Sequence, residues 1–154
     1  MKSSRERDQQ RLQAIHWGDL ETAYGSAEVV PRLILDFLYG KERVAVAAGS
    51  NLQNHLCHQY TRVSTAAAPA ASFCMSALAR PEPRVLEEAL DLVRGFAWGT
   101  EPTRDDLEPW HQELRALVVA QLPRVRELAQ HENESLADTA KLLLEEMDEQ
   151  DARS

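Results

Sequence analysis

Residues 26–38 read SAEVVPRLILDFL, and residues 64–76 read STAAAPAASFCMS. The two stretches lie 38 residues apart, and each begins with a serine that precedes a proline by five positions. In both, bulky apolar side chains follow the proline by four and by six positions: Leu35 and Phe37, then Phe73 and Met75. Serine is a favoured N-cap, and proline is well tolerated in the first turn of a helix. The pattern therefore predicts two equivalent helices, each begun by its serine.

The remaining apolar residues also recur at helical spacing, and no stretch alternates as a strand does. The expected helices are 4–17, 26–40, 42–58, 64–79, 83–98, one that begins at Thr103, Asp105 or Asp106 and reaches Leu128, and 135–147. Residues 19–25 are expected to form a loop. Pro123 predicts a kink or a break in the sixth helix. Gly49 lies inside the third helix, where it lowers stability by ~1 kcal/mol relative to alanine unless a neighbour packs there closely.

Helix, short turn and helix thus recur three times, which predicts one all-α domain over residues 1–154. A repeat of this length built from helix pairs is typical of a right-handed α-solenoid of HEAT-like hairpins. The expected parts are a capping helix at 1–18, hairpins at 26–58, 64–98 and 105–149, and a frayed tail at 150–154. An ordinary helical bundle with a chance similarity between two helices is the alternative.

The acidic charge of the chain is confined to its last third. Residues 1–100 contain 11 acidic and 11 basic side chains, whereas residues 101–154 contain 14 acidic and 6 basic ones and carry the whole net charge of −8. Because nucleic-acid and anionic-membrane binders show basic patches, this distribution argues against both classes. An acidic surface favours a basic protein partner. The acidic residues expected to guide it are Asp105, Asp106, Glu108, Asp138, Glu145 and Glu146.

The two cysteines are too few for a disulfide framework, and no apolar segment follows the polar N-terminus. No run of about 18 apolar residues is present that would span a membrane. We therefore expect a cytoplasmic protein that is a monomer when free.

A set of short motifs is spread between residues 17 and 73: Trp17, Tyr24-Gly25-Ser26-Ala27, Val30-Pro31, His58-Gln59, Thr61, Thr65-Ala66-Ala67-Ala68-Pro69 and Phe73. In these motifs the chain resembles a group of bacterial HEAT-like repeat proteins. Tyr60 stands where the group usually has glycine, and tyrosine disfavours positive φ. Members of the group often resemble immunity proteins of polymorphic or contact-dependent toxin systems. The resemblance therefore implies a protein that binds and blocks a cognate toxin without chemistry of its own.

Two sets of residues are predicted to contact such a partner. The first is the turn formed by His58, Gln59, Tyr60 and Arg62, with Tyr24 at the equivalent earlier turn, because solenoids bind partners at their turns and inner helices. The second is the pair of tryptophans, Trp98 and Trp110, around an acidic loop, because tryptophan is frequent in binding hot spots. As alternatives, His58 and Gln59 only join adjacent loops, and the tryptophans close the core between repeats.

No recognisable catalytic motif is present, so we expect no enzyme activity and no cofactor. The strongest cluster is His55, Cys57 and His58, whose residue types suit a soft or borderline metal. A structural role for these three residues is the competing interpretation. The functional alternatives to an immunity protein are therefore a HEAT-like scaffold or regulatory adaptor with a non-toxin partner and, more remotely, a metal-binding protein.

Overall fold

The first of the two serine–proline stretches forms the expected helix. The computed structural model describes residues 1–154, and in it Ser26 Oγ accepts a hydrogen bond from the Glu28 N–H (3.4 Å). A short 3-10 turn, η2 (Ala27–Val29), leads into helix α2 (Val30–Tyr39), with a proline in its first turn. Ile34 and Phe37 lie one turn apart on its buried face. The helical spacing of apolar residues thus predicts both the helix and its buried side.

The regular structure of the chain is helical apart from one short hairpin, which confirms the all-α prediction. The α-helices are α1 (Ser4–Gln13), α2, α3 (Glu42–Leu56), α4 (Ala67–Met75), α5 (Pro83–Gly99), α6 (Pro109–Ala120), α7 (Leu122–Leu128) and α8 (Glu134–Arg153). Further 3-10 turns are η1 (Trp17–Asp19), η3 (His58–Tyr60) and η4 (Ser76–Ala79). Within the expected loop, strands β1 (Glu21–Thr22) and β2 (Gly25–Ser26) pair antiparallel, with Glu21 opposite Ser26.

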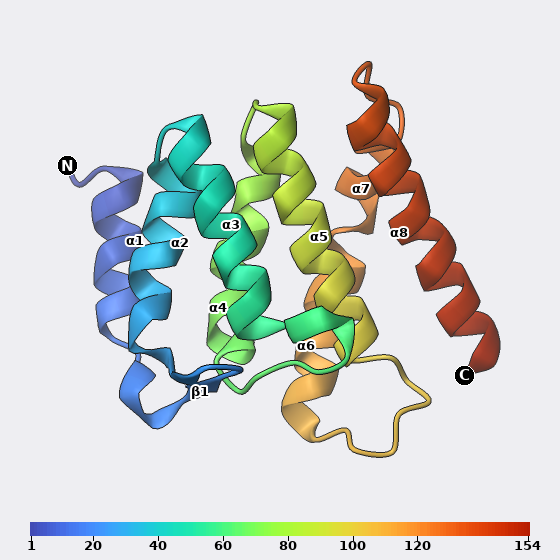
Figure 1. Ribbon diagram of the computed structural model, residues 1–154, viewed down its shortest axis with the longest axis horizontal. Helices are drawn as coiled ribbons and strands as arrows, with labels where there is room; N and C mark the ends of the chain where they lie inside the picture. The colour runs from blue at the N-terminus through green and yellow to red at the C-terminus, as the bar shows by residue number, and fades with distance from the viewer.

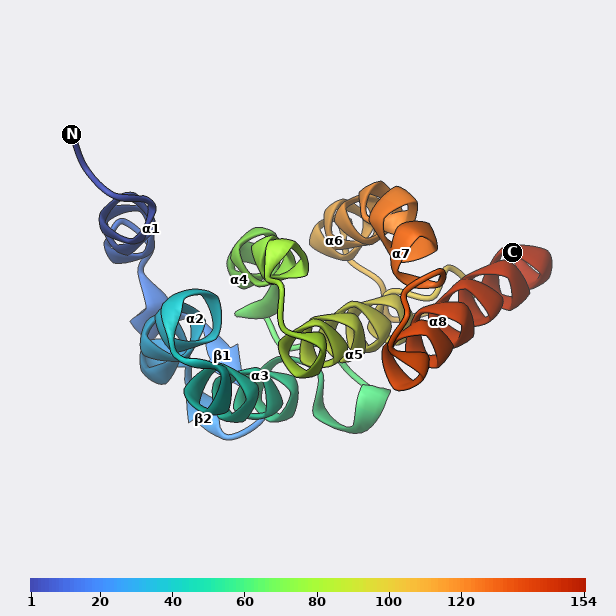
Figure 2. The ribbon, with the colours of Figure 1, turned by 90° about the horizontal axis from the view of Figure 1, so that it is seen from above.

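The helices stand in two adjoining rows (Figures 1 and 2). One row contains α3, α5 and α8, and the other contains α2, α4 and α6, with α1 beside α2 at the N-terminal end. Each row is held by contacts between neighbours, α3 with α5 and α5 with α8 in the first, and α2 with α4 and α4 with α6 in the second. A continuous core of 38 buried residues runs from Leu12 to Met147. The helices therefore share one apolar interior.

Several helices begin or end at different residues than expected. The first helix ends at Gln13 rather than at 17, because His16 and Trp17 enter a 3-10 turn. Ser64 does not cap α4, because its hydroxyl donates to the His55 carbonyl (2.9 Å) and the helix starts after Ala66. α6 begins only at Pro109, capped by Glu108 rather than by residue 103, 105 or 106.

The C-terminal third differs most from the expected hairpin. Pro123 does break the sixth helix, so that α6 and α7 are separate. Asn133 rather than Ser135 caps α8, through a hydrogen bond from the Leu136 N–H to Asn133 Oδ1 (3.0 Å). α8 then continues to Arg153, so the tail expected to fray from residue 150 is helical, held in part by the fully buried Gln150. No helix of the chain has both the length and the apolar character that crossing a membrane requires.

Candidate functional site

A polar cleft of about 660 Å³ lies at one end of the two helical rows. It is bordered by the β1–β2 hairpin, the segment between α3 and α4, and the loop between α5 and α6, along the lower edge of Figure 1. Five residues that the sequence predicts to bind a partner line this cleft together: His58, Arg62, Asp106, Glu108 and Trp110. Only three of its 15 lining residues are hydrophobic. Since small-molecule pockets are mostly apolar, this lining differs from that of a typical small-molecule site.

Tyr24 stands beside the cleft with its ring largely exposed (62%). The ring makes edge-on contacts with His55 (5.3 Å between centroids) and His58 (5.7 Å). Its hydroxyl lies 3.4 Å from His58 Nδ1. The two turns that the sequence pairs as equivalent positions therefore touch. An exposed tyrosine that rests on two neighbouring side chains presents a large contact area with few side-chain torsions to order.

The hairpin under Tyr24 is tied to the start of α4. The Ala66 N–H donates to the Glu21 carbonyl (3.1 Å), and the Glu21 N–H donates to Thr65 Oγ1 (3.0 Å). The Ala23 N–H donates to the carbonyl of His55 at the end of α3 (3.0 Å). These contacts hold the cleft wall in place without using the side chains of His58 or Arg62.

The opposite wall is a loop with its own internal pairs. Arg104 forms two hydrogen bonds with Asp106 (3.0 and 3.1 Å), which lower the pKa of the Asp106 carboxyl and raise the pKa of Arg104. The Glu108 carboxylate accepts a hydrogen bond from Trp110 Nε1 (3.1 Å). The Trp110 ring stacks on His111 at 3.7 Å between centroids. His111 Nδ1 in turn accepts the Glu108 N–H (2.9 Å), which completes a capping box for α6.

The charges of the cleft are therefore unequally available. Asp106 is paired with Arg104, whereas Arg62 is exposed and has no ion-pair partner in the structure. Asp105 is exposed on the same loop but outside the lining. The cleft thus offers one free cation among several acceptors.

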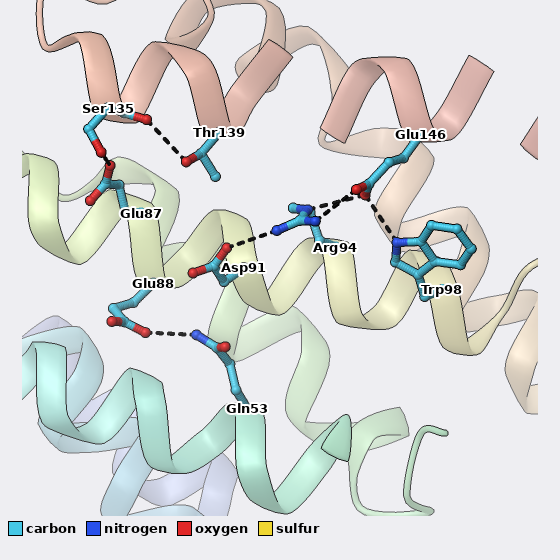
Figure 3. Close-up of polar contacts among 9 residues, drawn as sticks. All are labelled: Gln53, Glu87, Glu88, Asp91, Arg94, Trp98, Ser135, Thr139 and Glu146. Carbon is cyan, nitrogen blue, oxygen red and sulfur yellow. Dashed lines mark hydrogen bonds and ion pairs between the residues drawn. The ribbon is translucent and has the colours of Figure 1, made fainter. Parts of the chain in front are cut away.

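Two residues expected at the partner surface, Trp98 and Glu146, are bonded to each other between α5 and α8 (Figure 3). Glu146 is buried and accepts two hydrogen bonds from Arg94 (2.7 and 3.1 Å) and one from Trp98 Nε1 (3.1 Å). The contact with Glu146 raises the pKa of Arg94. This corrects the expectation that Glu146 belongs to the acidic surface, since its carboxylate is used inside the molecule. Asp138 and Glu145 are exposed on α8 and do not line the cleft.

The same face contains a carboxyl group with an unusual pKa, which the sequence does not reveal. Burial, together with the nearby carboxylates of Asp91 and Glu87, raises the pKa of Glu88 to about 7. Gln53 of α3 donates to this carboxyl (2.7 Å; Figure 3). Adjacent acids such as residues 87 and 88 ordinarily form a solvated helix face. The close approach of α3 is what buries one of them.

The turn that begins at His58 has a backbone conformation that is unfavourable for two of its residues. Gln59 and Tyr60 have φ angles of 53° and 58°, in the left-handed region. That conformation costs roughly 1–2 kcal/mol for each residue other than glycine. Gln59 is exposed, whereas Tyr60 is half-buried with its ring 5.3 Å from the Arg94 guanidinium. Tyr60 thus adopts the positive φ that its side chain makes unfavourable.

His55, Cys57 and His58 do not form a metal-binding cluster. Cys57 is buried, and a Cβ at Gly95 would lie 2.3 Å from its Sγ, so the thiol faces α5. His55 instead contacts Thr22 Oγ1 (3.2 Å) and Tyr24. No group of three or more histidine, cysteine or acidic side chains anywhere in the chain is placed to hold a metal ion.

No family model matches the chain, and no curated protein or solved structure matches it in sequence or in fold. The candidate function therefore rests on the geometry of the cleft and on the charge distribution.

The cleft also contains residues that the sequence analysis missed, chiefly Arg104 and His111. Their signals are local: Arg104 stands two residues before its acidic partner, and His111 three residues after the N-cap of its helix.

Proposed function

We propose that this chain is a non-catalytic protein-binding module that acts as an immunity protein, binding a cognate bacterial toxin and blocking its active site. The observation that carries the proposal is the gathering of the predicted turn and loop residues around one polar cleft, with Tyr24 exposed beside it. Tyrosine and tryptophan are enriched in protein-binding hot spots. The proposed occupant is a loop of the toxin.

The proposed partner has a basic surface. The acidic side chains of residues 101–154 outnumber the basic ones by 14 to 6, and Asp105, Asp138 and Glu145 are exposed without an ion-pair partner. Long-range attraction of this kind accelerates association and is screened by salt. We propose that these charges orient the toxin while the cleft supplies the close contacts.

The proposal extends to the architecture and the setting. We propose that the two rows of helices are a short right-handed α-solenoid of HEAT-like hairpins, capped at one end by α1. Supporting this, helices alternate between the rows along the chain from α2 to α6, and neighbours in each row are in contact. We further propose that the protein acts as a monomer in the cytoplasm, where it meets its toxin.

The decisive experiment uses the protein encoded by the neighbouring gene. If that protein stops growth when expressed alone, co-expression of this chain should restore growth, and the two purified proteins should associate more slowly as salt is raised. Failure to protect the cells, or association independent of salt, contradicts an immunity role. Binding to a non-toxic neighbour would favour the alternative of a scaffold or regulatory adaptor.

Charge reversal tests the acidic third directly. Reversing Asp105, Asp138 and Glu145 to lysine should slow association with the toxin, because all three are exposed and their removal breaks no ion pair. Glu42→Lys is the matched control, since Glu42 is also exposed and unpaired but lies in the electrically neutral part of the chain. If the control slows association as much per reversed charge as the triple variant does, only the net charge of the protein matters.

A further inference from the structure

Three hydrogen bonds hold the cleft-lining turn at residues 58–62. The Tyr60 N–H donates to the Cys57 carbonyl (3.1 Å), and the N–H and the hydroxyl of Thr61 both donate to the His58 carbonyl (3.2 and 3.1 Å). Against these stand two consecutive left-handed residues, Gln59 and Tyr60. Strained backbone of this kind persists only where the surrounding structure holds it.

The ring of Tyr60 supplies that surrounding contact. It packs where α5 has no side chain, since a Cβ at Gly95 would lie 3.1 Å from Tyr60 Cδ1. Burial raises the pKa of Tyr60 to about 12, which agrees with its half-buried position. The ring therefore faces α5 rather than a partner, and the exposed side chains of the turn are those of its neighbours.

A series of contacts connects the ring of Tyr60 to α8 through Arg94 and Glu146. The Arg94 guanidinium lies 5.3 Å from the Tyr60 ring centroid. Its orientation is set by the two hydrogen bonds to Glu146, and Asp91 adds a weaker contact at 3.4 Å (Figure 3). Trp98 holds Glu146 from the other side. A two-pronged arginine–carboxylate contact fixes the plane of the guanidinium as well as its position.

We infer that Tyr60, Arg94 and Glu146 act as one positioning unit, which holds the 58–62 turn in its cleft-lining shape and couples that turn to α8. In this arrangement Tyr60 is a positioning residue and not a partner contact. The turn presents His58 and Arg62 to the cleft because its aromatic residue is anchored on α5. A change at Glu146 on α8 is transmitted to the turn through Arg94.

Amide hydrogen exchange in the free protein tests the coupling. Glu146→Gln should make the Thr61 amide exchange about tenfold faster, because loss of one charged hydrogen-bond partner loosens the unit locally. The Ser64 amide, which donates to the Leu56 carbonyl just beyond the turn, should keep its rate. Glu145→Gln is the matched control, since Glu145 is the exposed neighbour of Glu146 on the same helix. An unchanged Thr61 rate in Glu146→Gln, or equal acceleration at Ser64, overturns the inference.

Substitutions in the turn separate anchoring from strain. Tyr60→Phe retains the ring and should exchange like the wild type, whereas Tyr60→Ala should accelerate exchange at Thr61 about as much as Glu146→Gln does. Gln59→Gly relaxes a left-handed residue without removing the ring and should leave exchange unchanged or slower. Tyr60→Gly relaxes the backbone equally but should still accelerate exchange. Slower exchange in Tyr60→Gly would mean that the ring does not hold the turn.

A milder variant keeps the test decisive if Glu146→Gln unfolds. Arg94→Lys retains the positive charge but loses the two-pronged contact, so it should accelerate Thr61 exchange while Ser64 stays unchanged.

The consequence for binding rests on the proposed function: Glu146→Gln should weaken the complex with the toxin, because only molecules with an ordered turn are competent to bind. If the toxin does not bind at all, the proposed function fails while the exchange result stands by itself.

Discussion

Gly49 of α3 lies directly against the ring of Phe37 of α2. A Cβ at residue 49 would stand 2.8 Å from Phe37 Cε1 and 2.8 Å from Glu88 Cβ, closer than such atoms approach one another. A glycine inside a helix is unfavourable by itself, and here it permits α2, α3 and α5 to meet. From the sequence, Gly49 is tolerable where a neighbour packs closely against it, and both α2 and α5 provide such a neighbour.

Gly49→Ala should therefore destabilise the protein despite the better helix propensity of alanine. We expect the free energy of unfolding to fall by about 1–3 kcal/mol, because a methyl group added to a filled core displaces its neighbours. Urea unfolding followed by circular dichroism measures the change. Ser50→Ala, at the exposed next position, should be neutral or slightly stabilising. A Gly49→Ala protein more stable than the wild type would contradict the packing described.

Glu88 should make the stability of the protein depend on pH. Its pKa is raised from 4.5 to about 7 in the folded protein, so the folded state holds this proton more tightly than the unfolded chain does. The contribution is therefore fully present below pH 4.5 and is lost as the pH rises through 7. The unfolding free energy of the wild type should fall over this range.

Glu88→Gln isolates that contribution. The difference in unfolding free energy between the variant and the wild type should shift in favour of the variant by about 1 kcal/mol from pH 5 to pH 8. The shift is modest because solvent screens a half-exposed group. The measurement is urea unfolding at both pH values. Glu113→Gln, an exposed and unpaired carboxylate on α6, is the control and should show no such gain. Parallel pH profiles for Glu88→Gln and the wild type would refute the assignment.

The helices were predictable from the sequence, whereas several of their ends were not. Apolar spacing and the flanking glycine and proline residues locate α2, α3 and α5 closely, because these signals are local. Ser64 has the right residue type for a cap but is recruited by the carbonyl of His55, nine residues earlier in the chain. Asn133 and Glu108 cap helices in place of the expected residues. Which of several capable side chains becomes a cap is decided by tertiary contacts.

The candidate site was predictable in part for a similar reason. Turn residues of successive helix pairs lie at the same end of the rows, so His58 and Arg62 meet the loop of Trp110. Glu146 is an inner residue because an outward-facing position on one helix becomes an inner one when a neighbour packs against it. Helical spacing identifies a face, but the partner across that face comes from 48 residues further along the chain.

Tyr24 should be a main contact for the partner while contributing little to stability. Its ring is 62% exposed and rests on two histidines at the edge of the cleft. Tyr24→Ala should weaken binding to the cognate toxin about tenfold or more, as expected for an aromatic hot spot, with little change in unfolding. Titration calorimetry measures the affinity. Val119→Ala, which shortens an exposed apolar side chain away from the cleft, should bind normally. Equal affinity of Tyr24→Ala and the wild type would move the contact surface elsewhere.

Both thiols should be unreactive while the protein is folded. Cys57 and Cys74 are only 1% and 2% exposed, and burial raises the pKa of each thiol. Because alkylating reagents attack the thiolate, iodoacetamide should modify neither residue in the native protein at neutral pH and both in urea. Mass spectrometry of the digested protein locates each modification, and Ala47→Cys on the exposed side of α3 supplies a thiol that should react promptly. Cys57 directly precedes the strained turn, and its side chain packs against Gly95 beside the ring of Tyr60. Rapid native modification of Cys57 alone would therefore mean that the turn opens spontaneously, contrary to the tight anchoring of Tyr60.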